Sequence, residues 1–122
     1  MKSKMPVLFI GHGSPLNALE VNDFTSDLSK VSHNIPKPDA ILVISAHWQT
    51  HGTMITSSDS PMQLYDFYGF PEELYQIKYT PPGSRTTAMQ ISDKSSAHKI
   101  LPDEHRGIDH AAWAVIKHIY PD

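Results

Sequence analysis

Two stretches of sequence decide the predicted fold: Val7-Leu8-Phe9-Ile10-Gly11-His12-Gly13-Ser14-Pro15 and Ala40-Ile41-Leu42-Val43-Ile44-Ser45-Ala46-His47-Trp48. Each begins with a continuous apolar run and continues into a short polar segment that contains a histidine. A continuous apolar run is typical of a strand that is buried on both faces, as in parallel sheets. The two runs therefore predict strands at 7–10 and 40–44.

A helix is expected between these strands, from Asp23 to Ser32. Phe24, Leu28 and Val31 have the i, i+4, i+7 spacing of one helix face, and Asp23 is a plausible N-cap. Strand, helix and strand in this order predict a right-handed βαβ unit with parallel strands.

The remaining sequence extends this α/β pattern. We expect a strand at 53–56, a helix that begins near Pro71, a polar helix at 84–97 and a final helix at 110–119. The 122 residues are enough for one domain, so residues 1–122 are predicted to form a single α/β domain.

Composition excludes several classes of protein. The chain is 39% hydrophobic and 19% charged, which argues against a disordered chain, and none of its apolar runs is long enough to span a membrane. A net charge of −3 without a basic stripe argues against nucleic acid as a partner. Cysteine is absent, so disulfides, thiol nucleophiles and thiolate ligands are excluded. The run at 7–10 is too short for a signal-peptide core, and we expect a cytoplasmic protein.

His12 and His47 form the sharpest candidate site. Each follows a predicted parallel strand at its carboxyl end, which is where open α/β sheets bind ligands. Neighbouring strands lie about 4.8 Å apart, so two imidazoles at adjacent strand ends can reach one metal ion. The alternative is that these are two unrelated histidines at the start of loops.

A third histidine, His110, follows Asp109, which is expected to cap the final helix. The helix N-terminus disfavours the imidazolium form, so a neutral His110 could bind a metal or donate a hydrogen bond beside one; an ordinary surface histidine is the alternative. Two other readings are rejected. The glycines around His12 lack the lysine of a phosphate-binding loop, and Ser14 is not in a G-x-S-x-G turn.

Three motifs resemble the class III extradiol ring-cleavage dioxygenases, in particular the 4,5-DOPA extradiol dioxygenase group. They are the segment 6–15, the segment 45–48 and the aromatic motif Tyr65-Asp66-Phe67-Tyr68-Gly69-Phe70-Pro71-Glu72-Glu73-Leu74-Tyr75. The segment 106–110, followed by Trp113, fits the same family in the same order. The resemblance extends over nearly the whole chain and implies a three-layer α/β sandwich with a mostly parallel central sheet, truncated relative to the family.

The resemblance also implies a function. It predicts a mononuclear iron(II) site that often takes zinc instead, and an activity that opens the ring of a catechol such as DOPA with O₂. His12 and His47 fall on two metal ligands and His110 on a catalytic active-site histidine. Ser14, Trp48 and Tyr68 are expected to bind the substrate.

The chain also departs from the family. The family's remaining metal ligand and its catalytic base have no counterpart here, so the chain resembles an N-terminal half that is impaired or inactive by itself. Asp109, His51 or a residue of a second copy could supply a third ligand. A single chain is expected to expose apolar surface, and we expect this surface to be buried in a homodimer. Two alternatives stay open: a small class II tetrapyrrole chelatase, and a non-catalytic half-domain that binds a metal or a partner.

Overall fold

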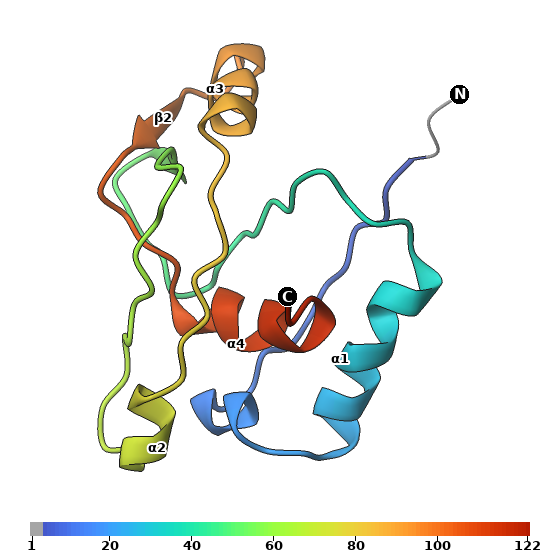
Figure 1. Ribbon diagram of the computed structural model, residues 1–122. Helices are drawn as coiled ribbons and strands as arrows, with labels where there is room; N and C mark the ends of the chain where they lie inside the picture. Colours follow the sequence, from blue (N-terminus) through green and yellow to red (C-terminus); the bar gives the residue numbers. More distant parts are fainter. Residues whose placement is uncertain (1–3) are drawn as a thin grey trace.

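The chain folds into short helices and a two-stranded parallel sheet, which confirms the predicted α/β class (Figure 1). The structure is a computed structural model that describes residues 4–122. No helix in this range is long and apolar enough to cross a membrane. In chain order the elements are the 3₁₀ helix η1 (Pro15–Ala18), α1 (Asp23–Asn34), β1 (Thr53–Thr56), α2 (Glu72–Tyr75), α3 (Arg85–Lys94), β2 (Ile100–Asp103) and α4 (His110–Ile119).

The sheet consists of β1 and β2, which run parallel with Thr53 opposite Ile100. Helix α3 packs against both strands. The strand predicted at 53–56 is confirmed with the same bounds, whereas β2 was not predicted. Its sequence, Ile-Leu-Pro-Asp, contains a proline and is too short for a recognisable pattern of alternation.

The strands predicted at 7–10 and 40–44 are not formed within residues 4–122, so the expected larger central sheet is reduced to one strand pair. The apolar sequences of both segments favour an extended backbone. Their residues make no backbone–backbone hydrogen bond in the described part of the chain, however. A strand needs a neighbour to bond with, and within residues 4–122 neither segment is paired with one. The apolar side chains of both segments are therefore largely exposed, whereas the sequence predicted strands buried on both faces.

The helices follow the sequence closely, with one correction at α1. Asn22, not Asp23, is the N-cap: its side chain accepts a hydrogen bond from Thr25 N (3.0 Å), and Thr25 Oγ1 accepts one from Asn22 N (3.0 Å). This reciprocal capping box satisfies two backbone donors, which a cap at Asp23 would leave open. Helix α3 ends at Lys94 instead of residue 97, and α4 has the predicted bounds.

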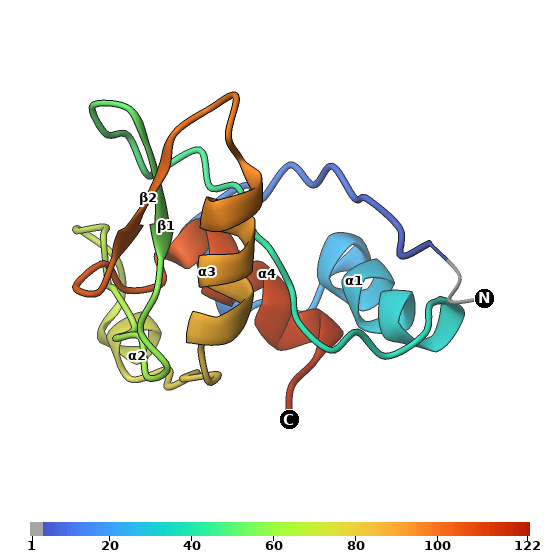
Figure 2. The same cartoon turned by 90° about the horizontal axis from the view of Figure 1, so that it is seen from above.

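Helix α4 lies at the middle of the fold, with α1 on one side and the sheet with α3 on the other (Figures 1 and 2). Its side chains enter two apolar clusters. Trp113 and Ala114 pack with Leu74 in the first cluster, and Val115 and Ile119 pack with Leu28 of α1 in the second. The helix thus joins the two cores and fixes the position of its own first residue, His110.

Trp113 should be the side chain on which stability depends most. It is fully buried, and its indole Nε1 donates to the carbonyl oxygen of Leu64 (2.8 Å). Trp113→Ala should lower the free energy of unfolding by about 3–5 kcal/mol because it leaves a large cavity. Trp113→Phe should cost less, since it keeps most of the packing and loses the hydrogen bond. Urea unfolding followed by circular dichroism measures both; equal stability of Trp113→Ala and the unaltered chain would contradict this account.

Candidate metal centre

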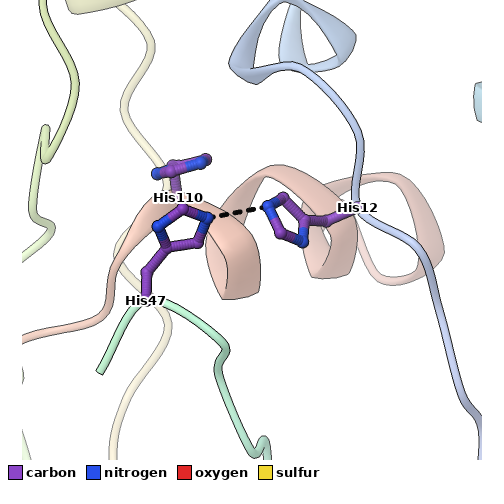
Figure 3. Close-up of side chains that lie close together, drawn as sticks. All are labelled: His12, His47 and His110. Carbon is purple, nitrogen blue, oxygen red and sulfur yellow. Dashed lines mark hydrogen bonds between the residues drawn. The ribbon is translucent and has the colours of Figure 1, made fainter. Parts of the chain in front are cut away.

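Three histidines that are distant in sequence meet at the amino end of α4 (Figure 3). His12 Nε2 lies 2.9 Å from His47 Nε2. Together with His110, they offer ligand nitrogens that all lie within 4.8 Å of one another. The predicted convergence of His12 and His47 is therefore confirmed as geometry, although the strands that were expected to bring it about are absent from the described chain.

The two Nε2 atoms are at hydrogen-bond distance, slightly closer than two ligands of one metal ion would be. When two imidazole nitrogens each lie ~2.1 Å from one metal ion, and the N–metal–N angle is between about 90° and the tetrahedral value, the two nitrogens are about 3.0–3.4 Å apart. Burial and the neighbouring rings of His47 and His110 lower the pKa of His12, which favours the neutral imidazole that binds metals. Imidazole nitrogens suit a divalent transition metal better than calcium or magnesium.

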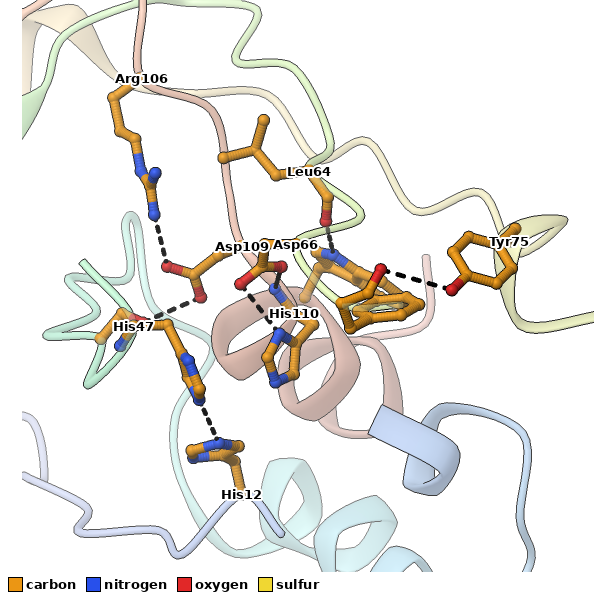
Figure 4. Close-up of polar contacts among 11 residues, drawn as sticks. His12, His47, Leu64, Asp66, Tyr75, Arg106, Asp109 and His110 are labelled. Carbon is orange, nitrogen blue, oxygen red and sulfur yellow. Dashed lines mark hydrogen bonds and ion pairs between the residues drawn. The ribbon is translucent and has the colours of Figure 1, made fainter. Parts of the chain in front are cut away.

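Asp66 holds His110 through two hydrogen bonds (Figure 4). Oδ1 accepts from the backbone N–H of His110 (2.9 Å), and Oδ2 lies 3.0 Å from Nδ1 of the same residue. Burial raises the pKa of Asp66, but the hydrogen bonds from His110 outweigh it and lower the pKa, so the carboxylate is the acceptor. Nδ1 then donates to this carboxylate, and Nε2 stays available to the site.

The expected cap at Asp109 is corrected by this arrangement. Asp109 occupies the N-cap position of α4, but its side chain makes no capping hydrogen bond. Asp66 instead accepts the first backbone N–H of the helix, at His110. A carboxylate from a distant segment thus satisfies one of the donors that helix starts leave open.

Asp109 instead joins α4 to the loop that carries His47. Its Oδ1 accepts from Ser45 Oγ (2.9 Å), and Ser45 Oγ accepts from the backbone N–H of His47 (3.1 Å). Its Oδ2 accepts from Arg106 Nη2 (3.0 Å). Asp109 is only 3% exposed, so the arginine provides the countercharge that a buried carboxylate requires. The guanidinium also lies over the ring of Trp48, 5.2 Å from its centre.

The predicted substrate-binding residues are placed less uniformly. Ser14 caps η1 by accepting from Leu16 N (3.2 Å), and it adjoins the loop of His12. Trp48 is half-buried under Arg106, next to His47. Tyr68 is 92% exposed. Their role in substrate binding stays a prediction.

The third nitrogen of the group comes from His110; neither Asp109 nor His51 belongs to the converging set in residues 4–122. The roles of Asp66, Ser45 and Arg106 were not predicted from the sequence. Asp66 had one signal: it is the only carboxylate among the aromatic side chains of residues 65–70.

Comparisons with known proteins bear on this site. No protein-family model matches the chain. It is 41% identical over 121 residues to "4,5-DOPA dioxygenase extradiol" of Escherichia coli (strain K12), covering 98% of this chain and 45% of that protein. It is 40% identical over 120 residues to the protein of the same name from Beta vulgaris, covering 93% of this chain and 45% of that one.

A solved structure agrees with these relatives. The crystal structure of an uncharacterized protein from Escherichia coli K12 matches with a TM-score of 0.72 and 37% identity, over 98% of this chain and 43% of that chain. The resemblance to the 4,5-DOPA extradiol dioxygenases is therefore confirmed over the part of these proteins that the chain covers. The chain spans less than half the length of the relatives it matches.

The histidine cluster predicts one site for a divalent transition metal per chain. Titration calorimetry with Zn²⁺ should show His12→Ala and His47→Ala binding more weakly than the unaltered chain. The loss should exceed the ~10–100-fold that is typical of outer partners of a metal site, because a ligand itself is removed. His98→Ala is the matched control, since His98 is exposed and outside the cluster. Undiminished binding by His12→Ala would show that the cluster is not the site.

Proposed function

We propose that this chain forms part of an extradiol dioxygenase site that opens the ring of a catechol, such as DOPA, with O₂. The observation that carries the proposal is the 2.9 Å approach of His12 Nε2 to His47 Nε2, beside His110. Proteins named as 4,5-DOPA extradiol dioxygenases at 40–41% identity support the same reaction class.

Iron(II) is the proposed metal, with zinc as a substitute, and His12 and His47 are its proposed ligands. When bound, the ion would supply Lewis-acid and redox chemistry. Few protein ligands leave coordination positions open, as this chemistry needs. His110 is proposed as the catalytic histidine: Asp66 holds its Nδ1, so Nε2 can hold or move a proton at the site.

Substrate access and binding are proposed to involve the side next to His47. His47 is exposed, so a small molecule can approach its ring from solvent. Ser14 and Trp48 adjoin His12 and His47 in sequence, and a flat catechol ring suits the indole of Trp48. Tyr68, which is exposed, would have to turn toward the site to take part.

A second candidate function is a half-domain that binds metal or a partner without turnover. It is supported by the converging histidines, which could hold a metal without any turnover. The names of the relatives support a dioxygenase over the tetrapyrrole chelatase that the sequence left open.

We also propose that the chain forms a homodimer. Its proposed location is the cytoplasm. A monomer leaves Val7 (97%), Phe9 (102%) and Ile44 (93%) in water. Light scattering coupled to size-exclusion chromatography should give twice the mass of one chain, with dissociation on dilution. A single-chain mass at high concentration would contradict the dimer.

Oxygen uptake separates the two functions. The chain should be loaded with iron(II) without air and then mixed with DOPA in air. We expect O₂ consumption and a yellow ring-opened product, more slowly than with the Escherichia coli relative at equal concentration, because part of the relative has no counterpart here. His12→Ala and His47→Ala should abolish both signals, and His98→Ala should not. Iron binding without O₂ uptake would favour the non-catalytic half-domain.

A further inference from the structure

The loop that carries His47 is tied to the start of α4 through a serine hydroxyl. Ser45 Oγ donates to Asp109 Oδ1 (2.9 Å) and accepts from the backbone N–H of His47 (3.1 Å). A hydroxyl can do both at once because it has one proton and two lone pairs. Arg106 donates to the other oxygen of Asp109 (3.0 Å), so the carboxylate that holds the hydroxyl is itself held (Figure 4). A continuous series of hydrogen bonds therefore connects the backbone of His47 to α4.

The loop that carries His12 is tied to the other end of the same helix. His118, in the last turn of α4, has its Nε2 2.7 Å from the carbonyl oxygen of Asn17 in η1. A carbonyl oxygen only accepts, so Nε2 carries the proton and donates it. Asn17 in turn donates from Nδ2 to the carbonyl oxygen of His12 (3.4 Å) and from its backbone N–H to that of Ser14 (3.0 Å). The turn that follows His12 is thus also held by α4.

Helix α4 keeps these two attachment points at a fixed separation. Asp109 and His118 lie at opposite ends of the helix, roughly 13 Å apart at a rise of about 1.5 Å per residue. Ala18 of η1 is buried in the same apolar cluster as Trp113 and Ala114 of α4, so η1 is packed on the helix as well. Because close packing resists small shifts, both histidine loops take their position from one rigid element.

We propose that Ser45 and His118 are positioning residues of the metal centre. Ser45 orients His47, and His118 orients His12 through Asn17. Neither residue belongs to the converging histidine group of residues 4–122, so each acts through the ligand that its loop carries. The inference rests on the proposed function, in which His12 and His47 bind the metal. Ligands that are already held near their bound geometry lose less freedom when the ion binds, and the affinity rises accordingly.

Nuclear magnetic resonance of the histidine rings in the metal-free chain tests the assignment of one ring to each residue. Comparison with His12→Ala and His47→Ala assigns the ring signals. Ser45→Ala should shift the His47 signals more than the His12 signals, and His118→Ala should do the reverse. A purely structural role would leave both rings in place or shift them alike in both variants.

Zn²⁺ titration calorimetry measures the consequence for the site. Ser45→Ala and His118→Ala should each weaken binding by about tenfold, the lower end of the range for outer partners of metal ligands. The double variant should lose about a hundredfold, because the two contacts are separate and their effects add as free energies. Ser45→Thr keeps the hydroxyl and His118→Gln keeps an N–H donor, so both should restore most of the affinity.

Two residues of α1 give matched controls. Ser29 is exposed, and its hydroxyl donates within its own helix to the carbonyl oxygen of Ser26 (2.7 Å). His33 is exposed in the last turn of α1, as His118 is in the last turn of α4. Ser29→Ala and His33→Ala should change neither the ring signals nor the Zn²⁺ affinity.

Unaltered Zn²⁺ affinity in Ser45→Ala and His118→Ala would overturn the proposal. Losses that Ser45→Thr and His118→Gln do not restore would also overturn it, as would equal shifts of both rings. Circular dichroism checks folding. Where an alanine variant unfolds, Ser45→Cys and His118→Phe carry the test, because they keep side-chain bulk while weakening or removing the hydrogen bond; they should bind Zn²⁺ as weakly as predicted for alanine.

Failure of the proposed reaction would be recognised separately. The ring signals and the Zn²⁺ affinity require neither iron nor O₂. The expected shifts and affinity losses, in a chain that takes up no O₂ with iron(II) and DOPA, would support the positioning role and contradict the dioxygenase proposal. O₂ uptake by the unaltered chain, with Zn²⁺ affinity unchanged in both alanine variants, would do the opposite.

Discussion

The burial of α4 on two opposite sides is the constraint on which the rest of the structure depends. Trp113 and Ala114 belong to one apolar cluster, while Val115 and Ile119 belong to the other. A helix held on two sides cannot shift without opening one of the two cores, and close packing makes such shifts costly. Because His110 is the first residue of α4, the position of its ring is fixed by side chains that never touch the site.

Two carboxylates then bring the remaining pieces to this fixed point. Asp66, from the aromatic segment, binds both the backbone and the ring of His110. Asp109 binds Ser45, which in turn binds the backbone of His47. Each carboxylate would be costly to bury without its partners, so each hydrogen bond that satisfies it also orders a histidine. The polar network and the apolar cores therefore specify the same arrangement of rings.

The part of this structure that could be predicted from sequence is the part that depends on local residues. Residues 53–56 and 110–119 have their predicted bounds because strand preference and helical periodicity act within a few residues. Whether 7–10 and 40–44 would pair as strands could not be decided in this way, since strand pairing depends on residues far apart in the sequence. Asp66 was missed for the same reason: its partner, His110, is 44 residues away.

The three histidines nevertheless converge although 7–10 and 40–44 form no strands. The loops that follow these two segments are held in place by other contacts. After the first segment, Gly13 adopts a positive φ of 66°, which brings Asn17 back toward the carbonyl oxygen of His12 (3.4 Å). This positive φ favours glycine at position 13, because L side chains rarely adopt such a backbone conformation. After the second segment, Ser45 and Asp109 hold the backbone of His47. The loops that carry His12 and His47 are thus ordered by contacts that are independent of strand pairing.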